Sequence, residues 1–241
     1  MKNNYHLLII NLFLVTSIAF ISSCYFAFDN LGPMAEEERN VPDFDRLKVT
    51  SGIDVTLAQG NRHRVIIKAN EDLIDDVETE VVNGTLKLNV DRKWFRGGGS
   101  VEAEITFVEL DMIDVSAGSD VESDGLLEFE DLDIEASSGS DLKLNLEAYS
   151  VQLRTSSGSD ADLKGAARDF EAKASSGSDI NAYDFEVENA ILECSSGSDI
   201  KTHVTRTMKV KASSGSDVHY RGDPELLEVN TSSGADLIKV N

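Results

Sequence analysis

The sequence is short of basic residues, cysteine and histidine, and each shortage narrows the range of functions. Its 22 lysines and arginines stand against 44 aspartates and glutamates, a formal net charge of −22. We expect no nucleic-acid partner, because phosphate binding needs a surplus of basic side chains. With two cysteines and four histidines, the chain has no metal-type cysteine pairs and no His-Glu-x-x-His motif, and phosphate-binding loops are also missing.

Proline and aromatic residues are also scarce, at three prolines and 7% aromatics, which suits narrow coils filled by small and aliphatic side chains. A 3.6-residue apolar period is missing, which argues against a helical solenoid. The leucine scaffold and Asn or Cys ladder of leucine-rich repeats are missing too. The 41% hydrophobic content follows a strict alternation, which favours a folded chain over a disordered one.

What the sequence does contain is the pentapeptide Ser-Ser-Gly-Ser-Asp, or a close variant, every 18 to 21 residues. Its seven copies are centred on Gly118, Gly139, Gly158, Gly177, Gly197, Gly215 and Gly234. A repeat of this length cannot bury its own apolar face, so neighbouring copies must stack. The period therefore predicts a solenoid.

The residues before each copy alternate between apolar and polar, as Leu132, Ile134 and Ala136 do around Glu135. The polar position next to the motif is occupied by Asp114, Glu135, Arg154, Lys173, Glu193, Lys211 and Asn230. This alternation predicts a strand with one buried face. A strand, a left-handed glycine corner and a second strand make one coil of an all-β parallel β-helix with about 19–20 residues per coil. We expect the motif serines of successive coils to hydrogen-bond along the stack.

Residues 47–55, LKVTSGIDV, form a degenerate eighth copy around Gly52. Between Gly52 and Gly118 the pattern predicts strands over 65–69 and 101–108. It also predicts a hairpin that joins 80–82 to 85–90 across an Asn-Gly turn, and one helical turn over 72–77. We therefore place the β-solenoid domain at residues 46–241.

The N-terminus resembles a bacterial lipoprotein signal peptide over residues 1–23. A short charged segment precedes an apolar run over 7–20, and two serines lead to Cys24. We expect Cys24 to be acylated and to hold the protein to the outer membrane, on its periplasmic or its surface side. An ordinary secretory peptide or a signal anchor is the alternative. Residues 24–45 have no periodicity and are expected to form a flexible acidic tether.

The other cysteine, Cys194, occupies an inward position just before a motif. We expect a buried thiol that packs as a small hydrophobic group. With Cys24 acylated, no intramolecular disulfide is available.

One aspartate holds the same place in every repeat, which makes this row the first candidate site. Its members are Asp54, Asp120, Asp141, Asp160, Asp179, Asp199, Asp217 and Asp236. Stacked carboxylates about 4.8 Å apart raise each other's pKa unless something neutralises them. Three hypotheses stay open: each Asp accepts hydrogen bonds from its own corner, Ca²⁺ bridges the coils, or the row binds a glycan or a partner protein. We assign no metal ligand.

A second candidate is the segment Arg92, Lys93, Trp94, Phe95 and Arg96, a basic patch around the single tryptophan. It either packs over the end of the solenoid or contacts a sugar or a lipid headgroup.

The SGIDVTLAQG element, the Asn-Gly hairpin and the serial SSGSD coils resemble the putative auto-transporter adhesin head GIN domain family over residues 46–240. The family occurs in lipoproteins of Bacteroidetes-type bacteria. The resemblance implies a right-handed parallel β-helix and brings no catalytic motif. We therefore expect a non-enzymatic adhesion or binding module of the cell envelope. A β-helical lyase or hydrolase acting on carbohydrate, or a structural envelope spacer, is the alternative.

Overall fold

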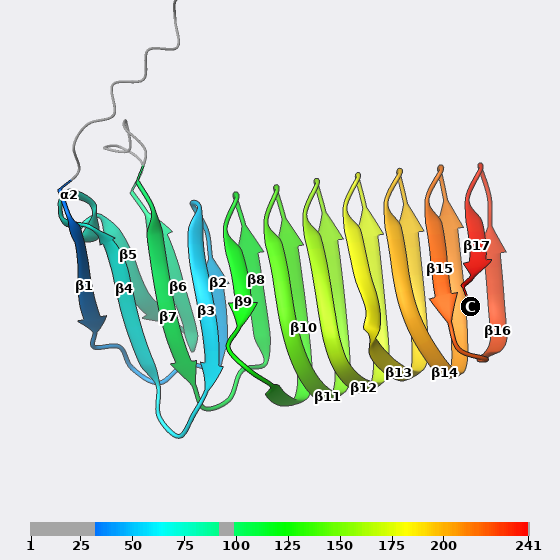
Figure 1. Ribbon diagram of the computed structural model, residues 1–241, viewed down its shortest axis with the longest axis horizontal. Coiled ribbons are helices and arrows are strands. Elements are labelled where there is room, and N and C mark those ends of the chain that lie inside the picture. Colours follow the sequence, from blue (N-terminus) through cyan, green and yellow to red (C-terminus); the bar gives the residue numbers. More distant parts are fainter. Residues whose placement is uncertain (1–31, 92–98, 241) are drawn as a thin grey trace, which may run out of the picture.

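The computed structural model describes residues 32–91 and 99–240, which form a β-solenoid whose coils stand side by side (Figure 1). Successive coils pair in parallel, and their motif aspartates stay in register although the pairing shifts farther along some strands, for example after Asp162 and after Ala182. Asp141 aligns with Asp160, 19 residues on, and Asp179 aligns with Asp199, 20 residues on. The predicted all-β parallel β-helix and its coil length are confirmed.

The regular coils are built from ten strands. They are β8 (Met112–Ser116), β9 (Asp120–Ser123), β10 (Leu127–Ser137), β11 (Asp141–Ser156), β12 (Asp160–Ser175), β13 (Asp179–Ser195), β14 (Asp199–Ser213), β15 (Asp217–Arg221), β16 (Glu225–Thr231) and β17 (Asp236–Lys239). Strands β11 to β14 are 15 to 17 residues long because the strand leaving one corner bends gently into the strand that enters the next.

The N-terminal part contains seven strands and one short helix. They are β1 (Met34–Arg39), β2 (Arg46–Val49), β3 (Ile53–Gln59), β4 (Arg64–Asn70), α2 (Glu71–Ile74), β5 (Val77–Val82), β6 (Thr85–Val90) and β7 (Val101–Phe107). Strands β2 and β3 pair in parallel with β8 and β9. The degenerate copy at Gly52 is therefore a true coil of the solenoid.

The residues between β3 and β8 fold back over the outer side of that coil. Strand β6 pairs in parallel with β2, and β7 pairs in parallel with β3. The predicted hairpin is confirmed, with β5 antiparallel to β6 and Val82 opposite Thr85. The predicted helical turn lies slightly earlier, at α2, where Leu73 and Ile74 are buried.

The expected tether over 24–45 is wrong for residues 34–39, which form β1. This strand is antiparallel to β4, with Met34 opposite Asn70 and Arg39 opposite Val65. The Arg39 guanidinium donates to the Ile74 carbonyl oxygen over 2.7 Å, and an ion pair of 3.0 Å joins Arg64 to Glu38. Its run of charges gave no strand-like alternation, yet β1 is ordered because it completes the sheet beside β4.

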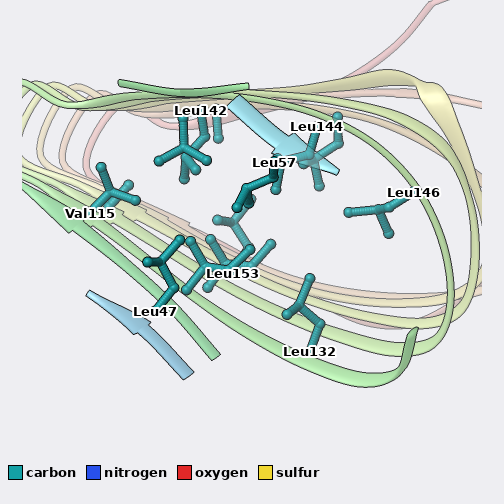
Figure 2. Close-up of a cluster of buried hydrophobic side chains, with 14 of the residues drawn as sticks. Leu47, Leu57, Val115, Leu132, Leu142, Leu144, Leu146 and Leu153 are labelled. Atoms are coloured by element: carbon teal, nitrogen blue, oxygen red, sulfur yellow. The ribbon is translucent and has the colours of Figure 1, made fainter. Parts of the chain in front are cut away.

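The core is a continuous row of aliphatic side chains inside the coils. Figure 2 shows Leu142, Leu144, Leu146 and Leu153 pointing inward from the walls of the coils, and all four are buried. Alternate positions of the strands β8 to β14 fill this core, as the period-two pattern predicts. No helix in the described ranges is long and apolar enough to cross a membrane.

Each corner depends on two consecutive residues with left-handed backbone. At the corner of β10 and β11, φ is +60° at Ser138 and +70° at Gly139, and the other corners repeat this pair. A Cβ added to Gly139 would meet no atom within 4 Å, so glycine is needed here for its backbone conformation and not for space. The backbone N–H of Gly139 donates to the Ser157 carbonyl of the next coil over 3.2 Å, which locks neighbouring corners in register.

The fourth residue of the motif closes the corner from inside. We name these residues the corner serines: Ser119, Ser140, Ser159, Ser178, Ser198 and Ser216, all fully buried. The Ser178 hydroxyl oxygen accepts the Ser175 N–H over 3.1 Å and lies 2.8 Å from the Ser175 carbonyl oxygen. It also lies 3.0 Å from the Thr155 hydroxyl of the preceding coil. The corner serines therefore bond along the stack, but to the Thr155 hydroxyl or to a backbone carbonyl of the preceding coil, as Ser140 does to Val115 and Ser159 to Ala136, and not to one another as expected.

Replacing a corner serine should destabilise the solenoid. We expect Ser178→Ala to lower the free energy of unfolding by about 1–3 kcal/mol, because the buried Ser175 N–H loses its acceptor. Urea unfolding of the full chain, followed by circular dichroism, measures the change.

Ser176→Ala is the matched control, because Ala117 already occupies the equivalent position with φ +58°. Equal urea midpoints for the two variants would contradict a bonding role for the corner serines.

Candidate functional site

The aspartate row lies just after the corners, as predicted, and links neighbouring coils. The Asp120 carboxylate accepts the backbone N–H of Asp141 over 3.2 Å, and the Asp179 carboxylate accepts the N–H of Asp199 over 3.0 Å. The pattern recurs between Asp160 and Asp179, Asp199 and Asp217, and Asp217 and Asp236. The side chains therefore bond to the next coil, whereas the first hypothesis placed their partners in their own corner.

Asp54 stands at the most acidic point of the row. Its pKa is raised, first by partial burial and then by the charges of Asp120, Glu102 and Glu122. Within residues 32–91 and 99–240, no three His, Cys, Asp or Glu side chains form a group that could hold a metal ion. Hydrogen bonding to the next coil gives five of the eight aspartates a structural role, and the cation and ligand hypotheses stay predictions.

The strand segments that lead into the corners form a second face, opposite the one that carries the aspartates. A groove runs along this second face. It has a volume of about 740 Å³ and crosses six coils. The first serine of each motif contributes to its wall, namely Ser137, Ser156, Ser175, Ser195 and Ser213. A charged row lies next to these serines: Asp114, Glu135, Arg154, Lys173, Glu193 and Lys211. We name this surface the serine groove.

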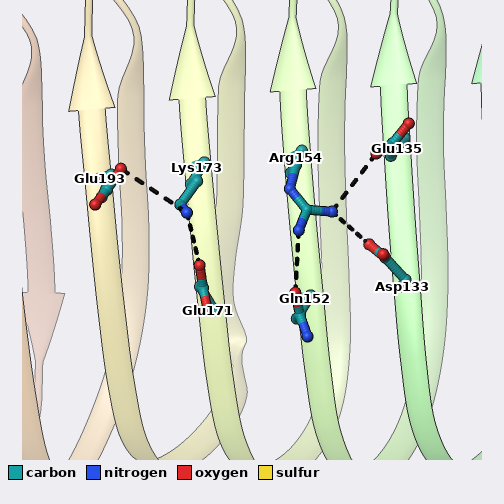
Figure 3. Close-up of polar contacts among 7 residues, drawn as sticks. All are labelled: Asp133, Glu135, Gln152, Arg154, Glu171, Lys173 and Glu193. Carbon is teal, nitrogen blue, oxygen red and sulfur yellow. Dashed lines mark hydrogen bonds and ion pairs between the residues drawn. The ribbon is translucent and has the colours of Figure 1, made fainter.

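Most charges of the serine groove are paired between coils. Figure 3 shows Arg154 reaching both Glu135 and Asp133 of the neighbouring strand, with N–O distances of 3.5 Å and 2.7 Å. In the same figure Lys173 reaches Glu171 at 2.7 Å and Glu193 at 3.9 Å. The hydrogen bond to Glu171, followed by these carboxylate charges, raises the pKa of Lys173. These ion pairs link the charged side chains of the groove to one another across neighbouring coils.

The serines of the groove have free hydroxyls. Their backbone groups bond to the corner serines, as the Ser156 N–H does to Ser159 over 3.1 Å. Within the described part of the chain, the side-chain oxygens of the groove serines make no hydrogen bond. A row of hydroxyls, each able to donate and to accept, suits a ligand that carries hydroxyl groups at regular intervals.

Sequence analysis did not identify the serine groove as a site, although it used the same residues. The row Asp114 to Lys211 served there only as the polar half of a strand pattern. Its alternation of both charge signs, beside a serine at constant spacing, is the signal that could have revealed it.

The cysteine and the histidines, which are the residue types most often used in catalysis, have different neighbours in the structure. Cys194 is buried as predicted, and burial raises the pKa of its thiol against the hydrogen bonds from Ser198 and Ser216. The His63 ring packs 4.4 Å from the Phe44 ring, whereas His203 lies 3.9 Å from Glu186.

Two sequence-predicted sites lie outside the described residues. These are the acylation site Cys24 with its signal peptide, and the basic segment Arg92 to Arg96 around Trp94. Both stay predictions.

Several solved structures share this fold. A putative adhesin from Bacteroides fragilis superposes with a TM-score of 0.80 at 15% identity, over 86% of this chain and 97% of that one. A putative lipid binding protein from Parabacteroides distasonis gives a TM-score of 0.67 at 17% identity, over 87% and 98% of the two chains. A putative adhesin from Parabacteroides merdae gives 0.65 at 15% identity, over 87% and 97%. At these identities the likeness establishes the fold alone.

No curated protein matches the sequence. The profile of the family described as "Putative auto-transporter adhesin, head GIN domain" matches residues 43–224. That span includes the coil at Gly52, the inserted strands and six of the seven motifs found first. The chain therefore belongs to the head GIN domain family of putative adhesins.

Proposed function

We propose that the protein is a lipid-anchored, non-enzymatic binding module of the cell envelope that holds a surface glycan in its serine groove. The observation that carries the proposal is the row of free serine hydroxyls beside charges of both signs. The family description, an adhesin head, agrees with a binding role.

The coil spacing favours an extended ligand that lies along the solenoid axis. Successive groove serines are one coil apart, about 4.8 Å, whereas an extended peptide advances only about 3.3 Å per residue. A peptide lying along the axis would fall out of step with the serines, so we favour a linear glycan over a protein segment.

The carboxylates in the groove favour binding over catalysis. Asp114 pairs with Lys48, Glu135 with Arg154, and Glu193 with Lys173. A glycoside hydrolase needs one carboxylic acid of raised pKa next to a free carboxylate. Paired carboxylates with regular spacing serve better as fixed hydrogen-bond acceptors for sugar hydroxyls.

The anchor would place the solenoid close to the membrane. Nine residues separate Cys24 from Met34, where β1 begins, so this linker spans at most about 35 Å. The coil near β1 would then lie toward the lipid, and β16 and β17 would lie farthest from it.

Removing the groove hydroxyls should weaken glycan binding. Each lost hydrogen bond costs about 0.5–1.5 kcal/mol, so we expect the triple variant Ser156→Val, Ser175→Val, Ser195→Val to lose at least about tenfold in affinity. A glycan array with the full chain identifies the ligand, and titration calorimetry with that glycan measures the loss.

Ser150→Val is the control, since Ser150 is half-buried in β11 and lies outside the groove. An array that retains no glycan, or a triple variant that binds as well as the parent, would refute the proposal.

Acylation should depend on Cys24 alone. Cells grown with an alkyne-tagged fatty acid should label the parent protein and the Cys194→Ser variant, because Cys194 is buried. Cys24→Ala should carry no label, since the acyl chain has no thiol to modify. Label on Cys24→Ala would place the modification elsewhere, and an unlabelled parent would rule the anchor out.

A further inference from the structure

The two ends of the solenoid differ in how their cores are covered. At one end α2 buries Leu73 and Ile74, and the outermost strand β1 carries Glu36, Glu37 and Glu38. Charged edge strands of this kind prevent pairing with other chains. The end at α2 and β1, on the left of Figure 1, is thus closed.

The coil of β16 and β17, at the right of Figure 1, is open. Leu226 aligns with the fully buried Met208 but is 44% exposed, and Val229 aligns with the buried Val210 but is 42% exposed. Of nine exposed large hydrophobic residues in the described ranges, four belong to this coil, including Leu227 and Ile238.

The backbone of this coil is also unpaired on its outer side. Within the described residues, β16 pairs only with β14 and β17 only with β15. Terminal repeats of a solenoid need a polar outer face to stay soluble. Strand β16 instead exposes Leu226, Leu227 and Val229 around one central charge, Glu228, and such an edge can pair with another strand.

We propose that this coil docks end to end onto the same coil of a second copy, related by a two-fold axis. Such a contact is self-complementary and closes as a dimer. Head-to-tail stacking is disfavoured, because at the opposite end α2 already covers the core and the edge strand β1 carries three glutamates.

The chain direction and the charges fit this dimer. Strand β16 runs toward the corner at Gly234 and β17 runs away from it. With corner over corner, β16 of one copy therefore lies antiparallel to β17 of the other. Thr231 and Asp236 flank the corner, and Glu228 and Lys239 each lie three residues farther along their strands. Glu228 of one copy is thus level with Lys239 of the other, which also pairs with Asp223 of its own chain. The two-fold axis brings Glu228 and Lys239 together twice.

The contact area is at the lower limit for a specific interface. Strand β16 has seven residues, about 23 Å at 3.3 Å per residue, and the two sheets lie about 10 Å apart. With the flanking side chains each end covers roughly 500 Å², so the dimer buries roughly 1,000 Å² in total. We therefore expect a weak dimer whose fraction rises with protein concentration.

The docking extends the proposed function. Its consequence for the cell rests on the lipid anchor that is part of that proposed function. If the anchor holds the α2 end near the lipid, two copies that meet at their far ends are anchored in two different membranes. The dimer would then join two surfaces, as a homophilic adhesion contact does.

A charge-exchange experiment tests the dimer. In sedimentation velocity of the full chain in mild detergent, we expect the parent to dimerise with rising concentration. Glu228→Lys alone and Lys239→Glu alone should each weaken dimerisation by about tenfold or more, because both cross-copy pairs become repulsive. An equimolar mixture of the two variants should restore the dimer, because each pair is again of opposite sign.

Glu37→Lys is the control, since it makes the same charge change at the closed end and should leave the dimer unchanged. A parent that stays monomeric, a mixture that fails to recover, or oligomers that keep growing with concentration would each overturn the proposal. Clumping of phosphatidylcholine vesicles that carry the lipidated chain then tests the membrane-joining role separately. Dimers in detergent without vesicle clumping would leave the docking intact and contradict that role alone.

Discussion

The whole structure depends on a corner in which two consecutive residues adopt left-handed backbone and the glycine N–H bonds to the next coil. At Ser157 and Gly158, φ is +58° and +70°, and the Gly158 N–H donates to the Ser176 carbonyl over 3.2 Å. A one-residue slip between coils would turn every inward side chain outward. The corner prevents that slip because it fixes both where the chain turns and which residue of the next coil it bonds. Coils of 18 to 21 residues can then vary at the gentle bend while the corners stay aligned.

A fixed register turns any residue that recurs in the motif into a straight row, so regularity alone is no evidence of function. The aspartate row and the groove serines are equally regular, yet they differ in what their side chains do. The Asp160 carboxylate accepts a hydrogen bond from the Asp179 N–H over 3.0 Å, and most other aspartates of the row accept the same bond. The hydroxyls of the groove serines have no partner in the described part of the chain, and they face the groove. Because its polar atoms are free, the serine groove is a better candidate for a binding site than the aspartate row.

Most of the fold follows from local sequence, because alternation and corner chemistry act over a few residues. The period predicts the coils, the Asn83-Gly84 turn predicts the β5–β6 hairpin, and the degenerate copy at Gly52 predicts β2 and β3. Three features depend on partners far along the chain and could not be predicted. Strand β1 is ordered only by β4. The stacking of β6 outside β2 joins Thr50 to Leu88 through a backbone bond of 3.0 Å. The third is the bond that five of the row aspartates accept from the next coil.

The two ends of the solenoid show how the same repeat is finished in different ways. Near the N-terminus the repeat is interrupted, and the inserted residues supply a helix and an antiparallel hairpin. Together with the glutamate-rich edge strand β1, which precedes the first coil, they close the core. In the coil of β16 and β17 the repeat simply continues, with apolar residues still at inward positions although no further coil in the described residues covers them. A stacked repeat gains its stability from contacts with two neighbours. A coil with one neighbour keeps about half of that stabilisation, and its exposed leucine and valine side chains retain the apolar surface that a second neighbour would bury.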